Sequence, residues 1–433
     1  MHSNRVIYKN IDNTTIFFDK QTEIWGSLDK KGHVSKSFLN SLPPVSKERN
    51  ETTPKQILLV LKLTKDCNLR CKYCYVDAGE NHNKDYMTKE TARNLLKWIK
   101  NNPDKNFSIN FHGGEPFLNM PTLQFITENA PSNIVSFMVQ TNGTLMQKNI
   151  QFIKDNNIGV GISLDGPPVL NDKMRIYANG TGSASKVMQG LKQLKRNRIK
   201  YGVICVVGEH NIANPDEVFD FFVSMGARNL KFSPLAQEGR SSNSIDCDEY
   251  FEFMKRIYFK LLEHNKRNNR VSVRNFDVKL INLLSRNRPY MCQRNPCGAA
   301  NCLFGVDTDG KIFACDKLIS NDKYICGDLK SSLKDIYSSK PASDIKKRTP
   351  KTIKKCDKCI WQSACGQGCT SAAINTFDNI FREDPFCDYY KKIFSFLALQ
   401  WLDNQRNLKF VLSPRFHSIL TKQSTDIEIN ERF

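Results

Sequence analysis

The chain has 433 residues, and its 64 Lys and Arg against 44 Asp and Glu give a formal net charge of +20. Hydrophobic residues make up 40% and charged residues 25%, as in ordinary globular proteins, and the length allows two or three domains. No apolar run approaches the length of a membrane span, and the N-terminus lacks the apolar core of a secretory signal. We therefore expect a cytoplasmic protein that does not interact with membranes.

Fifteen cysteines are many for a reducing compartment, where disulfides are disfavoured and dense cysteines indicate metal ligands. The basic residues are spread along the chain, which is typical of a solvated surface. If the positive charge recruits a partner, an acidic peptide is a better candidate than RNA, and we expect no nucleic-acid partner.

The predicted elements begin with a polar N-terminal segment that contains three short strands, at 5–9, 15–19 and 23–27. Apolar, β-rich runs then recur at 57–63, 107–111, 134–140, 158–164, 201–207 and 229–233. Helical patterns fill the gaps at 88–100, 122–129, 146–155, 184–196 and 215–225, and a last one covers 393–401. Strands that alternate with helices predict an α/β fold with a parallel sheet, whose chemistry lies at the carboxyl ends of its strands.

Cys67, Cys71 and Cys74 form a C-x3-C-x2-C run directly after the first of these strands. Three closely spaced thiolates can hold three irons of a [4Fe–4S] cluster and leave the fourth iron open to a small molecule. A zinc site is the alternative, and C-x2-C alone would favour it. The three-residue first gap and the preceding strand favour the cluster.

This run, with the aromatic Tyr73 before the third cysteine, resembles the radical S-adenosylmethionine (SAM) enzymes. The resemblance implies a partial (β/α)6 barrel in which the open iron binds SAM. Reductive cleavage of SAM then yields a 5′-deoxyadenosyl radical that abstracts a hydrogen atom from the substrate. It also implies that Tyr73 lies against the adenine.

Short motifs at the ends of other predicted strands resemble parts of the SAM site of this family. His112 is followed by Gly113, Gly114, Glu115 and Pro116, similar to the family's GGEP motif, which binds the amino group of SAM. Two glycines permit close backbone approach, and a carboxylate can pair with an ammonium group. The resemblance assigns Ser163 and Asp165 to the ribose and Arg175 to the carboxylate of SAM, although turn chemistry and an exposed arginine are open alternatives.

The later cysteines resemble the seven-cysteine SPASM domain. They follow the pattern Cys297-x12-Gly310-x4-Cys315, then Cys356-x2-Cys359-x5-Cys365-x3-Cys369, then Cys387. This domain holds up to two auxiliary [4Fe–4S] clusters with four ligands each, so one ligand is missing. Cys292 and Cys302 are both candidates, and we favour Cys292. The family's crossing pattern then groups Cys292, Cys297, Cys315 and Cys369 around one cluster, and Cys356, Cys359, Cys365 and Cys387 around the other.

Asp316 directly follows Cys315. In the similar anaerobic sulfatase-maturating enzymes, an aspartate in this place deprotonates the substrate as its radical is oxidised, and a carboxylate can serve as a general base. A structural turn residue is the alternative.

These resemblances imply a radical SAM/SPASM maturase that installs an oxidative crosslink (C–C, ether or thioether) in a ribosomally made precursor peptide. A flavodoxin or ferredoxin would supply its electrons. A sulfatase-maturating enzyme that forms formylglycine is one alternative, and a non-catalytic iron–sulfur electron-transfer protein is another. We expect an N-terminal extension at 1–55, which is either a partial leader-peptide recognition element or a plain cap on the barrel. The barrel is expected at 56–285, the SPASM domain at 286–390, and a C-terminal helix and tail at 391–433.

Overall fold

The computed structural model describes residues 6–20, 24–28, 54–79, 85–267, 270–285, 288–294 and 296–417. The chain divides into two compact units. We call the first the sheet unit, and it contains Pro54–Asn275 and Gly298–Ile345. The second, the cysteine unit, contains the N-terminal strands, Phe276–Cys297 and the chain from Lys346 onward.

The sheet unit is built on ten strands in the order β10-β9-β8-β7-β6-β5-β4-β11-β12-β13. Six neighbouring strands run parallel, namely β4 (Gln56–Lys62), β5 (Asn106–His112), β6 (Ile134–Thr141), β7 (Gly159–Ser163), β8 (Tyr201–Val207) and β9 (Asn229–Pro234). Their buried apolar residues form the core, as expected for a parallel sheet. The predicted α/β fold with a parallel sheet is confirmed.

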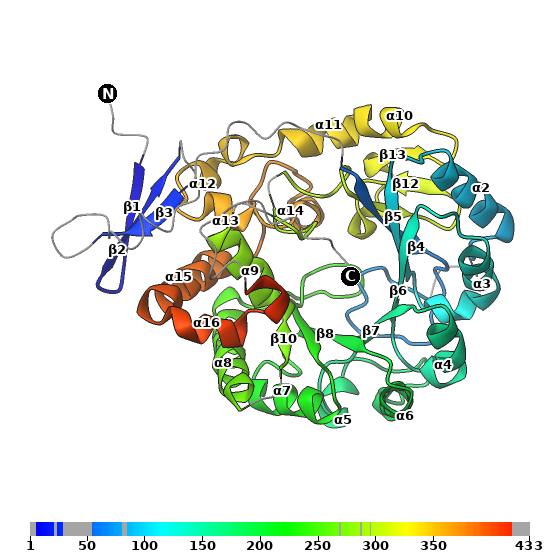
Figure 1. Ribbon diagram of the computed structural model, residues 1–433, viewed down its shortest axis with the longest axis horizontal. Helices are drawn as coiled ribbons and strands as arrows, with labels where there is room; N and C mark the ends of the chain where they lie inside the picture. The colour runs from blue at the N-terminus through cyan, green and yellow to red at the C-terminus, as the bar shows by residue number, and fades with distance from the viewer. Residues whose placement is uncertain are drawn as a thin grey trace. The chain divides into compact units, whose positions relative to one another are not determined.

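Helices cover the outer face of these strands (Figure 1). They are α2 (Lys89–Lys100), α3 (Met120–Glu128), α4 (Met146–Asp155), α6 (Ala184–Arg196) and α7 (Pro215–Ser224), close to the five predicted ranges. Thr88 caps α2, because its side chain accepts a hydrogen bond from the Thr91 N–H. The sequence analysis did not predict α8 (Cys247–Lys266), which Asp246 caps and which packs beside α7.

Four further strands extend this sheet at its two ends. The two-residue β10 (Ser272–Val273) pairs with β9, and β11 (Leu303–Val306) runs parallel to β4 on its free side. The antiparallel strands β12 (Lys311–Phe313) and β13 (Ile325–Asp328) follow. The first part of the segment predicted as a SPASM domain therefore continues the main sheet, and the domain limits at 285 and 390 stay predictions.

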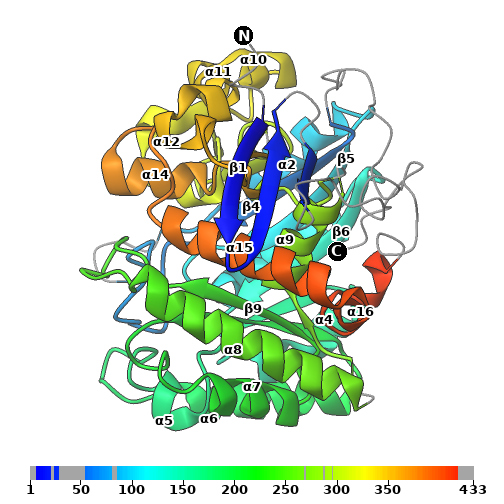
Figure 2. The ribbon, with the colours of Figure 1, turned by 90° about the vertical axis from the view of Figure 1, so that its left-hand side faces the viewer.

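The cysteine unit begins with an antiparallel sheet of β1 (Val6–Ile11), β2 (Thr14–Asp19) and β3 (Ile24–Ser27), which confirms the three N-terminal strands. Trp25 of β3 donates from Nε1 to the Leu283 carbonyl in α9 (Arg274–Leu284), at 2.8 Å. Its ring lies 5.7 Å from the rings of Trp361 and Trp401. Because Trp401 belongs to α15 (Cys387–Asp403), the small sheet lies beside this helix in both views (Figures 1 and 2).

The remaining helices are short. They are α5 (Pro168–Asn171), α10 (Leu333–Ser338), α11 (Lys340–Lys347), α12 (Lys354–Asp357), α13 (Gln362–Cys365), α14 (Thr370–Phe377) and α16 (Gln405–Val411). Across the described ranges, no helix combines the length and apolar character that crossing a membrane requires.

Candidate active site

The three-cysteine run occupies the loop after β4, at the carboxyl end of the sheet. Nitrogen donors point at its sulfur atoms: the Leu69 N–H lies 3.4 Å from Cys67 Sγ and the Ala78 N–H 3.4 Å from Cys74 Sγ. Burial raises the pKa of the Cys67 thiol to about 12 and also raises that of Cys71. Such thiols lose their protons when a metal centre compensates the charge, so this donor set fits an iron–sulfur cluster.

Gly113 and Gly114 pack against the backbone that precedes the cysteines. A Cβ atom on Gly113, whose φ is +137°, would lie 2.4 Å from the Thr64 carbonyl oxygen, and one on Gly114 would lie 2.0 Å from that of Asp66. The Gly114 and Glu115 N–H groups donate to the same two carbonyls, at 2.8 and 2.9 Å. Both glycines are therefore needed to hold the turn after β5 against the cysteine loop.

Glu115 is fully buried behind that turn, where Pro116 starts a short 3-10 helix. Its carboxylate accepts hydrogen bonds from Thr141 Oγ1 at 2.7 Å and from the Asn142 and Phe117 N–H groups at 2.8 and 3.2 Å. Burial raises its pKa to about 7. A buried carboxylate held only by neutral donors fits a ligand ammonium group.

Tyr73, Asp165 and Arg175 form one buried network. The Tyr73 hydroxyl donates to Asp165 and accepts from Arg175 Nη1 at 2.9 Å. The ring of His210 stacks 6.0 Å from that of Tyr73, and its Nε2 lies 3.5 Å from Asp165 Oδ2. Ser163 ends the neighbouring strand β7, and its hydroxyl accepts from Gln140 Nε2 at 2.9 Å. The structure thus brings together three residues that the sequence analysis had assigned separately.

Asp316 lines a small pocket in the same unit. The lining residues are Val60, Lys62, Tyr75, Val76, His112, Gly113, Asp316 and Ile319. Lys62 and His112 face each other across β4 and β5 as register partners. Burial lowers the pKa of both of them. Because Tyr75 directly follows Cys74, this pocket lies close to the three-cysteine loop.

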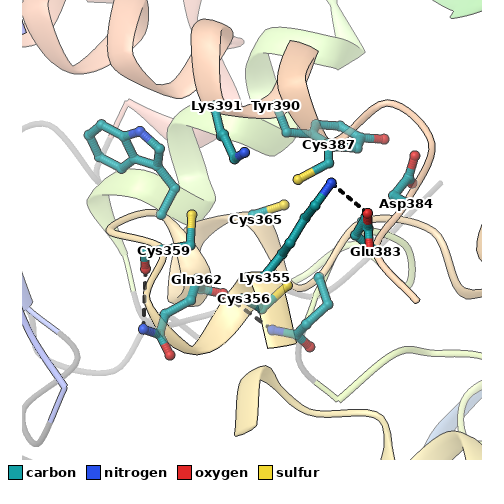
Figure 3. Close-up of a pocket in the computed structure, with 13 residues that line it drawn as sticks. Lys355, Cys356, Cys359, Gln362, Cys365, Glu383, Asp384, Cys387, Tyr390 and Lys391 are labelled. Atoms are coloured by element: carbon teal, nitrogen blue, oxygen red, sulfur yellow. Dashed lines mark hydrogen bonds and ion pairs between the residues drawn. The ribbon is translucent and has the colours of Figure 1, made fainter. Parts of the chain in front are cut away.

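A second cysteine site lies in the cysteine unit. Cys356, Cys359, Cys365 and Cys387 line one pocket, and their sulfur atoms turn towards a shared space (Figure 3). Beside them, Lys355 Nζ pairs with Glu383 Oε1 at 2.7 Å. Within the described ranges, no group of three or more His, Cys, Asp and Glu side chains forms a preformed site for a single metal ion. Four thiols around one space match the donor set of a fully ligated [4Fe–4S] cluster.

The other predicted cluster group is split between the units: Cys292, Cys297 and Cys369 belong to the cysteine unit and Cys315 to the sheet unit. This grouping stays a prediction. Cys302 is buried just before β11, and its carbonyl accepts from the Leu58 N–H at 2.8 Å, whereas Cys292 is exposed. The choice between these two cysteines stays open.

Four residues of the site had no predicted role, namely Thr141, Asn142, Lys62 and His210. The first two hold Glu115, and Asn142 Nδ2 also lies 3.7 Å from Cys67 Sγ. All four lie at or just after the carboxyl end of a parallel strand. Their position in the topology was the signal that could have identified them.

Comparison with known proteins places this arrangement in a family. Residues 61–222 match the model of the radical SAM superfamily, and residues 297–360 match that of SPASM, an iron–sulfur cluster-binding domain. A cysteine-type anaerobic sulfatase-maturating enzyme of Clostridium novyi is 29% identical over 354 residues, which cover 78% of this chain and 94% of that protein.

Solved structures support the same conclusion. Histidine-tagged anSMEcpe with bound AdoMet aligns with a TM-score of 0.73 and 25% identity, covering 84% of this chain and 98% of that one. Streptococcus suis SuiB bound to precursor peptide SuiA aligns with a TM-score of 0.60 over 89% of this chain and 99% of that one, and at 14% identity it shows the fold alone. The chain belongs to the radical SAM superfamily, whose enzymes use AdoMet and a [4Fe–4S] cluster, and it carries a SPASM iron–sulfur cluster-binding domain.

Proposed function

We infer that this enzyme oxidises a side chain of a peptide or protein substrate by two electrons. The observation that carries this proposal is the position of Asp316. Its carboxylate lines a pocket with Tyr75, the residue after Cys74, and it directly follows the predicted cluster ligand Cys315. A proton acceptor therefore lies close to the place where the substrate radical would form.

The residues at the strand ends have distinct roles in this proposal. Cys67, Cys71 and Cys74 hold the [4Fe–4S] cluster, and SAM bound there supplies the 5′-deoxyadenosyl radical. Glu115 receives the ammonium group of SAM, as its burial among neutral donors supports. Arg175 pairs with the carboxylate, Ser163 and Asp165 bind the ribose, and Tyr73 contacts the adenine.

Asp316 completes the oxidation. After a hydrogen atom has left the substrate carbon, the Asp316 carboxylate would take one proton from the remaining radical, and an auxiliary cluster held by the later cysteines would accept one electron. For a cysteine substrate the product is a thioaldehyde, which water converts to the aldehyde with release of H2S. Lys62 and His112 line the same pocket as Asp316.

Formylglycine formation is the first form of this chemistry to test. The sulfatase-maturating enzyme of Clostridium novyi is matched over 94% of its length, and a serine-type enzyme of Klebsiella aerogenes is 27% identical over 369 residues. These similarities cover 78% and 81% of this chain, so they support a shared reaction type more strongly than the fold alone would.

Crosslinking of a precursor peptide is the second candidate. A three-stranded sheet precedes the barrel, in the segment where a partial leader-peptide recognition element is predicted. SuiB, which shares the fold, was solved with its precursor peptide. The non-catalytic alternative is set aside, because the chain belongs to an enzyme superfamily and places a buried carboxylate beside its open cysteine site.

Mass spectrometry of two substrates separates these products. The enzyme, reduced with dithionite under anaerobic conditions, is incubated with a cysteine-containing sulfatase peptide or with the peptide of a short reading frame beside its gene. Formylglycine exchanges one sulfur and two hydrogens for one oxygen, whereas a crosslink loses two hydrogens only. A Cys71→Ala variant is the control, and unchanged masses for both peptides, despite SAM cleavage, would contradict the proposed substrates.

A further inference from the structure

One stretch departs from the even spread of charge along the chain. We call residues 346–358 the lysine-rich segment: it holds seven basic residues and one acidic residue, Asp357. The single arginine, Arg348, is buried and donates to the carbonyls of Ile380, Gln367 and Arg382 at 2.8 to 3.1 Å. Arg348 therefore fixes the segment to the fold, and the lysines remain at the surface.

The lysines of this segment are exposed and mostly not neutralised. Lys351, Lys354 and Lys358 are exposed, and none of them forms an ion pair with another described residue. Lys355 does pair with Glu383, yet its side chain is 58% exposed. A group of uncompensated like charges on a small area costs stability through self-repulsion, so it indicates a surface whose charge is used.

The lysine-rich segment also carries part of the four-cysteine pocket. Cys356 lies within it and Cys359 directly follows it. Lys355 and Lys391 line the pocket beside the sulfur atoms (Figure 3). Lys391 pairs with Asp388 at 2.9 Å, as Lys355 does with Glu383. Two paired lysines thus line the pocket, and Lys354 and Lys358, which pair with no described acidic residue, flank Cys356 and Cys359 in the chain.

We propose that the lysine-rich segment, with Lys391, is the docking surface of an acidic, low-potential electron-transfer protein. This rests on the proposed cluster at Cys356, Cys359, Cys365 and Cys387. The docked protein gives up one electron and the cluster gains one, and no covalent bond forms or breaks. Complementary charge steers the partner to the surface and speeds the encounter.

The position of the charge favours an electron carrier over a peptide or a nucleic acid. A cluster with four protein ligands has no open iron, so its use is electron transfer, which requires a partner to come close to its sulfur atoms. An acidic peptide or an RNA would gain from the same charges, but neither needs this proximity.

The test measures how fast a reduced acidic flavodoxin reduces the iron–sulfur clusters of the intact enzyme, by stopped-flow absorbance. Lys351, Lys354 and Lys358 are replaced together by Gln in one variant and by Glu in another. A charge-matched control replaces Lys186, Lys192 and Lys195 of α6, which are also exposed, by the same residues. The docking variants should be roughly 10-fold slower or more at low salt, with Glu slower than Gln.

At about 1 M salt, where the Debye length is about 3 Å, the difference from the control should vanish. Dithionite-driven SAM cleavage should be unchanged in every variant, and its absence from the wild type would refute the proposed function instead. Rates equal to those of the control would overturn the docking surface. A wild-type rate of cluster reduction by flavodoxin that does not depend on salt would overturn it too, and this measurement requires no variant. Weaker binding of polyglutamate or duplex RNA with unchanged flavodoxin rates would also overturn it.

Discussion

The three-cysteine loop after β4 and the four-cysteine pocket of the cysteine unit use the same ligand in different surroundings. Around the first lie a buried carboxylate at Glu115, the Tyr73–Asp165–Arg175 network and the pocket that contains Asp316. Around the second, the charged neighbours are Lys355, Lys391, Glu383 and Asp384, and a lysine-rich surface begins directly beside it.

This difference indicates that the two cysteine sites have different roles. Three thiolates leave one iron open, and the polar groups converging on it are suited to bind and orient a small molecule. Four thiolates leave no open iron, so neighbouring residues act on the cluster's charge and on its access to partners. In the proposed function, the same cysteine chemistry serves for bond cleavage in one site and for electron transfer in the other.

The largest expected effect follows from Cys71→Ala. Loss of one of three ligands should remove the first cluster, so that SAM cleavage, measured as 5′-deoxyadenosine, falls to background and the iron content decreases. Cys326→Ala is the control, because this buried cysteine on β13 lies outside every predicted ligand set. SAM cleavage by Cys71→Ala at the wild-type rate would show that the open site lies elsewhere.

Asp316→Asn should uncouple SAM cleavage from product formation. An amide of the same shape cannot accept the proton, so product formation should fall about 10²- to 10⁴-fold while 5′-deoxyadenosine still forms. Asp309→Asn, at an exposed turn between β11 and β12, is the matched control. Unimpaired peptide oxidation by Asp316→Asn would leave Asp316 with a structural role only.

Glu115→Gln should weaken SAM binding. A hydrogen bond to a charged group contributes about 1.5–3 kcal/mol, which corresponds to a roughly 10- to 100-fold higher Kd in calorimetry. Because burial raises the Glu115 pKa to about 7, the carboxyl takes up a proton below that pH, and SAM affinity of the wild type should rise as the pH passes upward through 7. The Gln variant should lack this rise, whereas Glu128→Gln on α3, an exposed site, should keep it.

The smallest expected effect is on the free energy of unfolding, and it comes from the ion pair between Lys355 and Glu383 beside the four-cysteine pocket. The hydrogen bond from Lys355 holds the Glu383 pKa at about 2, below its ordinary 4.5. The pair therefore stabilises the fold above pH 4.5, and this stabilisation is lost as the pH falls through about 2. Because Lys355 is largely exposed, Lys355→Met should cost at most about 1 kcal/mol in denaturant unfolding at pH 7. Lys351→Met, at a lysine that forms no ion pair with another described residue, should lower the free energy of unfolding by less. Equal losses in the two variants would mean that the ion pair contributes nothing to stability.

Local patterns predicted the parallel sheet, because each strand between β4 and β9 is an apolar run followed by an amphipathic helix. They did not predict α8, although its buried residues Phe253, Met254, Ile257 and Leu261 follow a clear helical spacing. The pairing of β11 with β4 could not be predicted, since it joins segments about 240 residues apart through backbone hydrogen bonds.

Prediction of the candidate site from sequence has the same limit, because contacts between distant segments leave no local pattern. Motif spacing indicated Cys67, Cys71, Cys74 and Glu115 as candidates, because these residues are close in sequence to a recognisable strand end. Lys62, His112 and Asp316 share one pocket only because β4, β5 and the chain after β12 meet in space. His210 reaches Tyr73 from the loop after β8, and no local pattern marks such a contact.

Electron paramagnetic resonance of the reduced enzyme, with and without SAM, tests the contrast between the two sites most directly. Addition of SAM should change only the signal that is absent from Cys71→Ala, and should leave unchanged the signal that is absent from Cys365→Ala. A SAM-induced change in the signal that depends on Cys365, or no change in the one that depends on Cys71, would contradict the assignment of the open and the closed cluster.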